Sequence, residues 1–155
     1  MEKNRKPFLS PNKYYVEILK NLFSGNVSSA TNLLQFLYFA NNLVGQEDIY
    51  KQYKEIVFEE IKCNEILAQN IISLGESPIY QNSQKVWLSA SFLEYPKSIK
   101  QMLDCSIEIK EKYIINLKFA ISKITEKHLV NDLKQLLIIN QKHKEILSIL
   151  LQKNT

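Results

Sequence analysis

The stretch that decides the fold is residues 50–74, YKQYKEIVFEEIKCNEILAQNIISL. Apolar residues recur in it at the spacing of one face of an α-helix, and they are Ile56, Leu67, Ile71 and Leu74. Glu60 and Cys63 fall on the same face, where a globular helix carries apolar residues. A carboxylate that faces a core is costly unless it is paired, hydrogen-bonded or bound to a metal. The fold must therefore provide a partner for Glu60.

The composition is that of an ordinary globular chain. Its 155 residues suit one domain, which we expect over residues 10–155 after a flexible N-terminal arm at residues 1–9. Three glycines and four prolines favour a few long elements. The net charge of +4 is too small and too evenly spread to indicate nucleic-acid binding. No run approaches the roughly 18 apolar residues of a membrane span, so we expect no membrane association.

The two cysteines, Cys63 and Cys105, form no CxxC motif and no dense framework. Such sparse cysteine usage is typical of a reducing compartment. No apolar segment follows the charged residues after Met1, so no signal peptide is predicted. We therefore expect a cytoplasmic protein.

Helix start and stop signals divide the chain into one short and four long helices. A Ser10-Pro11 start and a Gly25 stop predict a short helix over about 11–24, which we expect outside the bundle. Asn26 or Ser28 would cap the next helix, which runs to about Val44. The remaining predicted helices cover about 48–74, 96–124 and 125–152.

The connection at residues 76–95 is too long for a simple turn. In extended form it can span the length of a bundle, which is about 30 Å for 20 helical residues. Such a crossover leaves the helices on either side of it parallel. The pattern predicts an all-α fold, a four-helix bundle with a long crossover between the second and third long helices and a short N-terminal helix.

Each long helix has an apolar stripe that polar residues interrupt. The interrupting residues are Ser29, then Glu60 with Cys63, then Lys110, then Asn140 with His143. Two of these sets have i, i+3 spacing, which puts both side chains on one face of the helix. A bundle can gather such residues at one level, as metal sites in bundle cores do.

With these motifs, the chain resembles the ferritin-like superfamily, in particular its rubrerythrin-like and small bacterial ferritin-like branch. The resemblance covers residues 14–152. EIKC at 60–63, followed by LGESP at 74–78, is similar to Glu-Met-x-His followed by Leu-Gly-Gly-x-Pro. INQKH at 139–143 is similar to Asp-Glu-x-x-His, IEIK at 107–110 to Ile-x-x-Glu, and SSATNLLQF at 28–36 to Ser-Glu-Leu-x-Ala-x-x-Gln-Tyr.

The resemblance implies a di-iron oxidoreductase centre with six ligand positions. In this chain they are Ser29, Glu60, Cys63, Lys110, Asn140 and His143. Only Glu60 and His143 keep the family's ligand type, and Lys110 brings a positive charge to the place of a cation. We therefore expect a Lys110–Glu60 ion pair in the core instead of metals. The predicted protein has no cofactor and is a non-catalytic structural or partner-binding bundle, as a homodimer or with another protein.

Other hypotheses remain for the same residues. In one, Glu60, Cys63 and His143 hold a zinc or iron ion in a residual metal-binding or oxidoreductase protein. In another, Cys63 is a reactive thiol, provided that solvent reaches it and Lys110 stabilises its thiolate. Lys110 would be catalytic if its pKa were perturbed. The simpler alternatives are a hydrogen-bonded Asn140–His143 pair and a Cys63 that packs as a small apolar side chain.

Overall fold

A computed structural model describes residues 9–155, which form five α-helices and one short 3₁₀ helix, with no extended strand in this range. The helices are α1 (Lys13–Phe23), α2 (Ser29–Asn41), α3 (Glu47–Ser73), η1 (Ala90–Phe92), α4 (Ile99–Lys123) and α5 (Lys127–Lys153). The predicted all-α class and the long helices are confirmed. The predicted arm at 1–9 lies outside the described residues except for Leu9, whose N–H donates to the Ser73 carbonyl at 2.9 Å.

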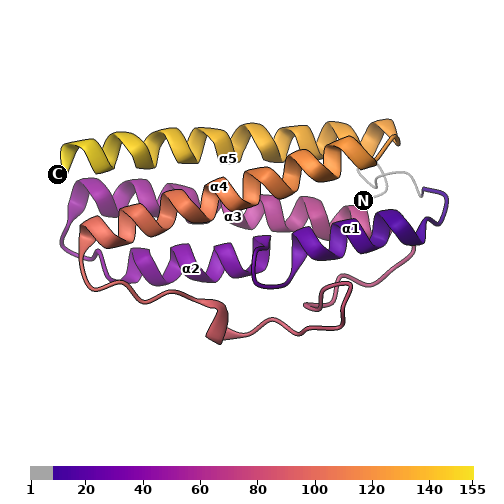
Figure 1. The fold of residues 1–155 in the computed structure, drawn as a ribbon, viewed down its shortest axis with the longest axis horizontal. Coiled ribbons are helices and arrows are strands. Elements are labelled where there is room, and N and C mark those ends of the chain that lie inside the picture. Colours follow the sequence, from indigo (N-terminus) through magenta and orange to yellow (C-terminus); the bar gives the residue numbers. More distant parts are fainter. Residues whose placement is uncertain (1–8) are drawn as a thin grey trace, which may run out of the picture.

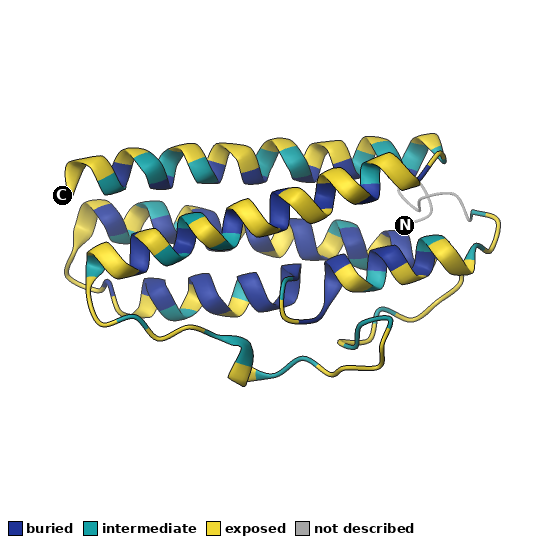
Figure 2. Ribbon diagram, viewed as in Figure 1, coloured by how far each residue is buried: buried dark blue, intermediate teal, exposed yellow. Residues whose placement is uncertain are grey.

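The helices form an elongated bundle (Figure 1). α4 and α5 are an antiparallel pair, and α3 runs parallel to α4 because the crossover returns the chain to the opposite end. α1 and α2 run in the same direction, one after the other along the bundle, so that together they occupy the position of one long helix. Buried residues line the inner faces of the helices and exposed ones the outer faces of α4 and α5 (Figure 2).

The prediction that the short N-terminal helix packs outside the bundle is wrong. Leu19, Leu22 and Phe23 of α1 are buried in the same apolar cluster as Leu67 of α3 and Leu133 of α5. The reason is the break between α1 and α2. There the chain turns through Gly25 at φ +132°, a conformation that favours glycine, and continues along the same side of the bundle.

The core has two apolar clusters, one at each end of the bundle. The first joins α1 to α3, α4 and α5, and the second joins α2 to the same three helices. The polar residues that interrupt the apolar stripes lie between the two clusters in sequence on α3, α4 and α5. The split of the first bundle position into α1 and α2 therefore brings a helix start, at Ser29, close to the middle of the bundle.

Three helix ends differ from the prediction, and one of them is the start of α4, which lies at Ile99 after the Ser98 cap and not at Pro96. The side chain of Asn12, rather than Ser10, caps α1 by accepting from the Tyr15 N–H at 3.0 Å. α2 is capped by Ser28, one of the two predicted caps, but it ends at Asn41. As a result Val44 lies in the following turn with 74% of its surface exposed, while Leu43 is buried.

The crossover between α3 and α4 runs along the bundle on the side of α1 and α2 (Figure 1). Aromatic side chains fix it at both ends. The Tyr80 ring stacks on Phe23 of α1 with centroids 5.0 Å apart, and the Tyr95 ring meets Tyr38 of α2 edge-on at 4.9 Å. None of the helices within residues 9–155 combines the length and hydropathy that a membrane span requires.

Candidate functional site

The four long helices bring the six predicted ligand positions into the interior. Ser29, Glu60, Cys63, Lys110, Asn140 and His143 are all fully buried. Full burial of a lysine, a glutamate and a histidine in one core is unusual, because charged groups lose their hydration there unless they pair with each other. The structure thus confirms that the polar interruptions of the stripes point inward.

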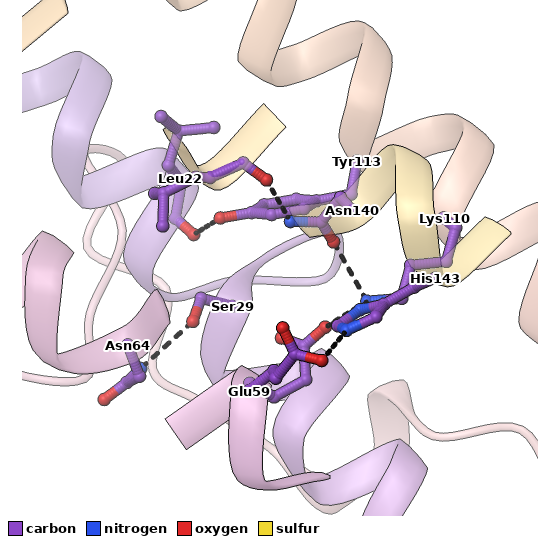
Figure 3. Close-up of polar contacts among 10 residues, drawn as sticks. Leu22, Ser29, Glu59, Asn64, Lys110, Tyr113, Asn140 and His143 are labelled. Atoms are coloured by element: carbon purple, nitrogen blue, oxygen red, sulfur yellow. Dashed lines mark hydrogen bonds and ion pairs between the residues drawn. The ribbon is translucent and has the colours of Figure 1, made fainter. Parts of the chain in front are cut away.

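The ammonium of Lys110 is the centre of this group (Figure 3). Its Nζ donates to Glu60 Oε1 and to Asn140 Oδ1, the latter at 2.9 Å, and lies 2.9 Å from His143 Nδ1. The ring of Phe36 lies beneath it, 4.8 Å from Nζ to the centroid. An ammonium has three N–H donors, and each has an acceptor here. The contact between Lys110 and Glu60 is the one predicted from the sequence.

Asn140 is held in place by its own helix and by Lys110, and His143 by Lys110. The Asn140 amide Nδ2 donates to the Leu136 carbonyl one turn earlier at 2.8 Å, which turns the amide oxygen towards Lys110. The predicted hydrogen bond between Asn140 and His143 is therefore replaced by two contacts to a shared ammonium. The i, i+3 spacing on α5 places both side chains on the Lys110 side of the helix.

His143 is neutral in this environment. Burial, and then the positive charges of Lys110 and Lys142, lower the pKa of its imidazole to about 2. Because Nδ1 faces an ammonium that can only donate, Nδ1 accepts and the proton lies on Nε2. Nε2 lies 3.4 Å from Glu59 Oε1, outside hydrogen-bond geometry but close enough for an electrostatic contact.

Sequence reasoning missed Glu59. It precedes Glu60 on α3 and is partly exposed, so it does not fall on the apolar stripe that was used to select inward residues. Its carboxylate also lies 3.8 Å from Lys142 Nζ at the surface. A signal was present in the Glu59-Glu60 pair itself, since adjacent positions on a helix are only about 100° apart and both can border one interface.

Ser29 and Cys63 are inside the bundle but are not part of the Lys110 network. The Ser29 hydroxyl accepts from the Asn64 amide at 3.3 Å, and the Asn64 oxygen accepts from the Tyr80 hydroxyl at 3.4 Å. Cys63 belongs to the apolar cluster at the α1 end. Burial and the negative charge of Glu60 raise the pKa of its thiol to about 12. Solvent does not reach the thiol, and the opposing effect of the Lys110 charge is outweighed, so Cys63 packs as an apolar side chain.

Two buried tyrosines flank the network on α3 and α4. The Tyr53 hydroxyl lies 2.7 Å from the Ser106 hydroxyl, one turn before Lys110, and the Tyr113 hydroxyl donates to the Leu22 carbonyl at 3.2 Å. Burial raises the pKa of both phenols, so both stay protonated. Sequence reasoning did not select them, because aromatic residues on an apolar stripe look like ordinary core.

The donor set does not fit a di-metal centre. Two divalent ions require several anionic ligands, and the centre supplies the single fully buried carboxylate of Glu60 together with a neutral imidazole and an ammonium. Within residues 9–155, no three histidine, cysteine, aspartate or glutamate side chains come together in an arrangement that could hold a metal ion. The nitrogen of Lys110 lies where the carboxylate and the imidazole converge, and its positive charge repels a cation there.

Comparison with known proteins identifies the architecture. No family model matches the sequence, and no curated protein sequence is similar to it. Among solved structures, KatB, a manganese catalase from Anabaena PCC7120, superposes with a TM-score of 0.87 at 16% sequence identity, over 99% of this chain and 80% of that chain. A second structure, of wild-type KatB, gives a TM-score of 0.85 at 16% identity over the same shares.

The chain has the ferritin-like fold. A likeness at 16% identity shows the arrangement of the helices and not the chemistry of the site. The chemistry must therefore be argued from the residues that this bundle places at its centre.

Proposed function

We propose that this protein is a metal-free ferritin-like bundle of the rubrerythrin-like type, in which the Lys110–Glu60 ion pair replaces the metal ions. It is a non-catalytic protein that serves as a structural or partner-binding bundle. It works in the cytoplasm, a reducing compartment, which agrees with its free cysteines Cys63 and Cys105.

One observation carries this proposal. The Lys110 ammonium has acceptors from both neighbouring helices, and its three partners converge on a single nitrogen atom. A buried charge network is favourable only when its hydrogen bonds are satisfied. Every N–H of the ammonium is used, so Lys110 itself needs no further partner. To bind a metal, the site would first have to release Lys110 from Glu60.

Metal content after expression with iron, manganese and zinc tests the proposal. We expect the untagged protein to contain much less than one metal ion per chain by elemental analysis, and to show no disproportionation of hydrogen peroxide. The matched control is the triple variant Ser29→Glu, Lys110→Glu, Asn140→Glu, which restores three carboxylates to the ligand positions. Near-stoichiometric metal in the unmodified protein would contradict the proposal.

A second function has a specific observation in its favour. Glu60 Oε2 is buried and has no hydrogen-bond partner, and a buried carboxylate oxygen of this kind can be a ligand for an ion. His143 Nδ1 becomes a second ligand atom once Lys110 no longer donates to it. In this alternative the protein is a residual metal-binding or oxidoreductase protein that uses Glu60, Cys63 and His143. It predicts that Lys110→Met, which removes the ammonium, raises the affinity for zinc or iron, and that His143→Gln abolishes that gain.

The partner-binding role is supported by apolar side chains on the outer surface. The side chains of Phe58 on α3, Ile115 and Phe119 on α4 and Ile138 on α5 are each more than half exposed. Exposed apolar surface of this kind commonly marks protein interfaces. We propose a homodimer as the simplest partner. Sedimentation velocity of the wild type and of Ile115→Lys, Phe119→Lys tests it, and a monomer at all concentrations in both would contradict it.

A further inference from the structure

A cavity of about 540 Å³ lies away from the Lys110 network, between α2, the end of the crossover and the first half of α4. Its size is in the range of small-molecule sites, roughly 300–1,000 Å³. Phe92, Tyr95 and Pro96 of the crossover form one wall, and Cys105 and Ile109 of α4 form the other. The proposed function, which rests on the Lys110 network, assigns no role to this cavity.

Asn32 of α2 lines the cavity and has an unused hydrogen-bond donor. Only 2% of its surface is exposed, and its Nδ2 has no hydrogen-bond partner in the structure. Buried amide donors are normally satisfied, because leaving one unpaired loses its interaction with water. Nδ2 has almost no accessible surface, so it reaches a ligand only when the Asn32 amide turns towards the cavity that the residue lines. A ligand that offers a carbonyl or hydroxyl oxygen would then supply the missing acceptor.

The neighbouring Gln35 fixes the rim of the cavity. Its buried side chain donates to the Glu94 carbonyl at 2.9 Å and accepts from the Glu94 N–H at 2.7 Å. These two hydrogen bonds hold the crossover against α2 at Glu94, whose carboxylate lies at the rim of the cavity. Gln35 is therefore a positioning residue for the charge at the rim.

The charge of the lining is negative, although the chain as a whole has a net charge of +4. Three carboxylates and one ammonium line the cavity, and they belong to Glu94, Asp104, Glu108 and Lys112. Glu108 pairs with Lys112 at 2.8 Å, and Asp104 pairs with Lys100 at 3.4 Å. Within residues 9–155 the Glu94 carboxylate forms no ion pair, and it interacts with the ammonium of Lys112 only at longer range.

We propose that this cavity binds a small organic cation that also carries a hydrogen-bond acceptor. Its ammonium group lies beside the Glu94 carboxylate and the aromatic rings of Phe92 and Tyr95, which favour a cation by charge and by cation–π attraction. Its carbonyl or hydroxyl oxygen accepts from Asn32 Nδ2. This site is independent of the metal content of the bundle centre.

Three probes of equal length test the two recognition elements separately. 4-Aminobutanamide has both an ammonium and a carbonyl group, pentylamine has only the ammonium, and pentanamide has only the carbonyl group. Isothermal titration should show saturable binding of 4-aminobutanamide, at least about tenfold tighter than either of the other two, since one lost polar contact commonly costs about a factor of ten. No saturable binding of 4-aminobutanamide, or equal binding of pentanamide, would overturn the proposal.

Cys105 reports occupancy of the cavity. It is half-buried and lines the wall, whereas Cys63, the other thiol, is completely buried and serves as an internal reference. We expect 4-aminobutanamide to slow alkylation of Cys105 by iodoacetamide at a fixed alkaline pH, with alkylation of Cys63 unchanged. Equal rates with and without the probe would count against binding in this cavity.

Two substitutions complete the test. Glu94→Gln should weaken binding of 4-aminobutanamide about tenfold, while the matched control Glu65→Gln, an exposed glutamate on α3 outside the lining, should not. Asn32→Leu should weaken binding while leaving the melting temperature equal or higher, because it removes an unsatisfied buried donor. Unchanged binding in Glu94→Gln overturns the proposal. So does a wild-type dimer that Glu94→Gln converts to a monomer, because the cavity would then be a protein interface.

Discussion

Lys110 on α4 and Glu60 on α3 form an ion pair in which both side chains are completely inaccessible to solvent. The pair links two parallel helices that the crossover brings together, and Asn140 and His143 connect it to α5. Removal of one partner of such a pair leaves an uncompensated buried charge, whereas removal of both does not.

Lys110→Glu should be the most destabilising substitution at the centre. It places two carboxylates against each other in a buried position, and we expect the free energy of unfolding to fall by about 3–5 kcal/mol. Urea denaturation at neutral pH measures the change. Lys112→Glu, an exposed position two residues further on α4, is the control and should change stability much less. Unchanged stability in Lys110→Glu would contradict the ion pair.

The combination Lys110→Met, Glu60→Leu should be more stable than either single variant. Each single change strands one buried charge, while the double change replaces the pair with apolar side chains. A double-mutant cycle on unfolding free energies should give a favourable coupling of at least about 1 kcal/mol. Additive effects within error would show that the two groups do not interact.

His143 should make the protein acid-sensitive. Its pKa is lowered to about 2 in the folded protein from 6.5 in the unfolded chain, so protonation favours the unfolded state. The stability from the neutral imidazole is complete above pH 6.5 and is lost as the pH falls towards the folded-state value. Between pH 7 and pH 5 this contribution amounts to about 2 kcal/mol.

The measurement is denaturation at both pH values for the wild type, His143→Gln and His128→Gln. The first variant should lose about 2 kcal/mol less than the wild type over this interval. His128 lies at the start of α5, far along the helix from the network, so the second variant should follow the wild type. Parallel pH profiles for all three proteins would show that protonation of His143 is not linked to unfolding.

Tyr113→Phe should test the attachment of α1 to the bundle. The Tyr113 hydroxyl donates to the Leu22 carbonyl in the last turn of α1, where carbonyls lack partners within the helix. We expect a loss of about 1–2 kcal/mol, mostly as an increase in local opening of α1. Hydrogen exchange of the α1 amides should rise relative to those of α5. Uniform exchange changes over all helices would contradict this local role.

The helical periodicity of the sequence was sufficient to predict α3, α4 and α5 and the inward direction of Glu60, Lys110, Asn140 and His143. A polar residue on an otherwise apolar stripe can point only into the core once the helix packs. The long connection at 76–95 also predicted the parallel arrangement of α3 and α4, because a chain of that length must cross the bundle. Charge alone then indicated Lys110 as the partner of Glu60, since no other cation interrupted a stripe.

Beyond that pair, only the tertiary structure determined which residues of different helices are in contact. Periodicity tells which face of a helix is buried, but it carries no information on the height and rotation at which two helices meet. It therefore did not show that Glu59 faces His143, that Ser29 bonds to Asn64, or that Tyr113 reaches α1. It also did not show that α1 completes the core, because that depends on the turn at Gly25 directing α1 and α2 along one side of the bundle. The sequence alone determined which groups are buried, and packing determined their partners, because the distances between side chains on different helices are set only when the helices come together.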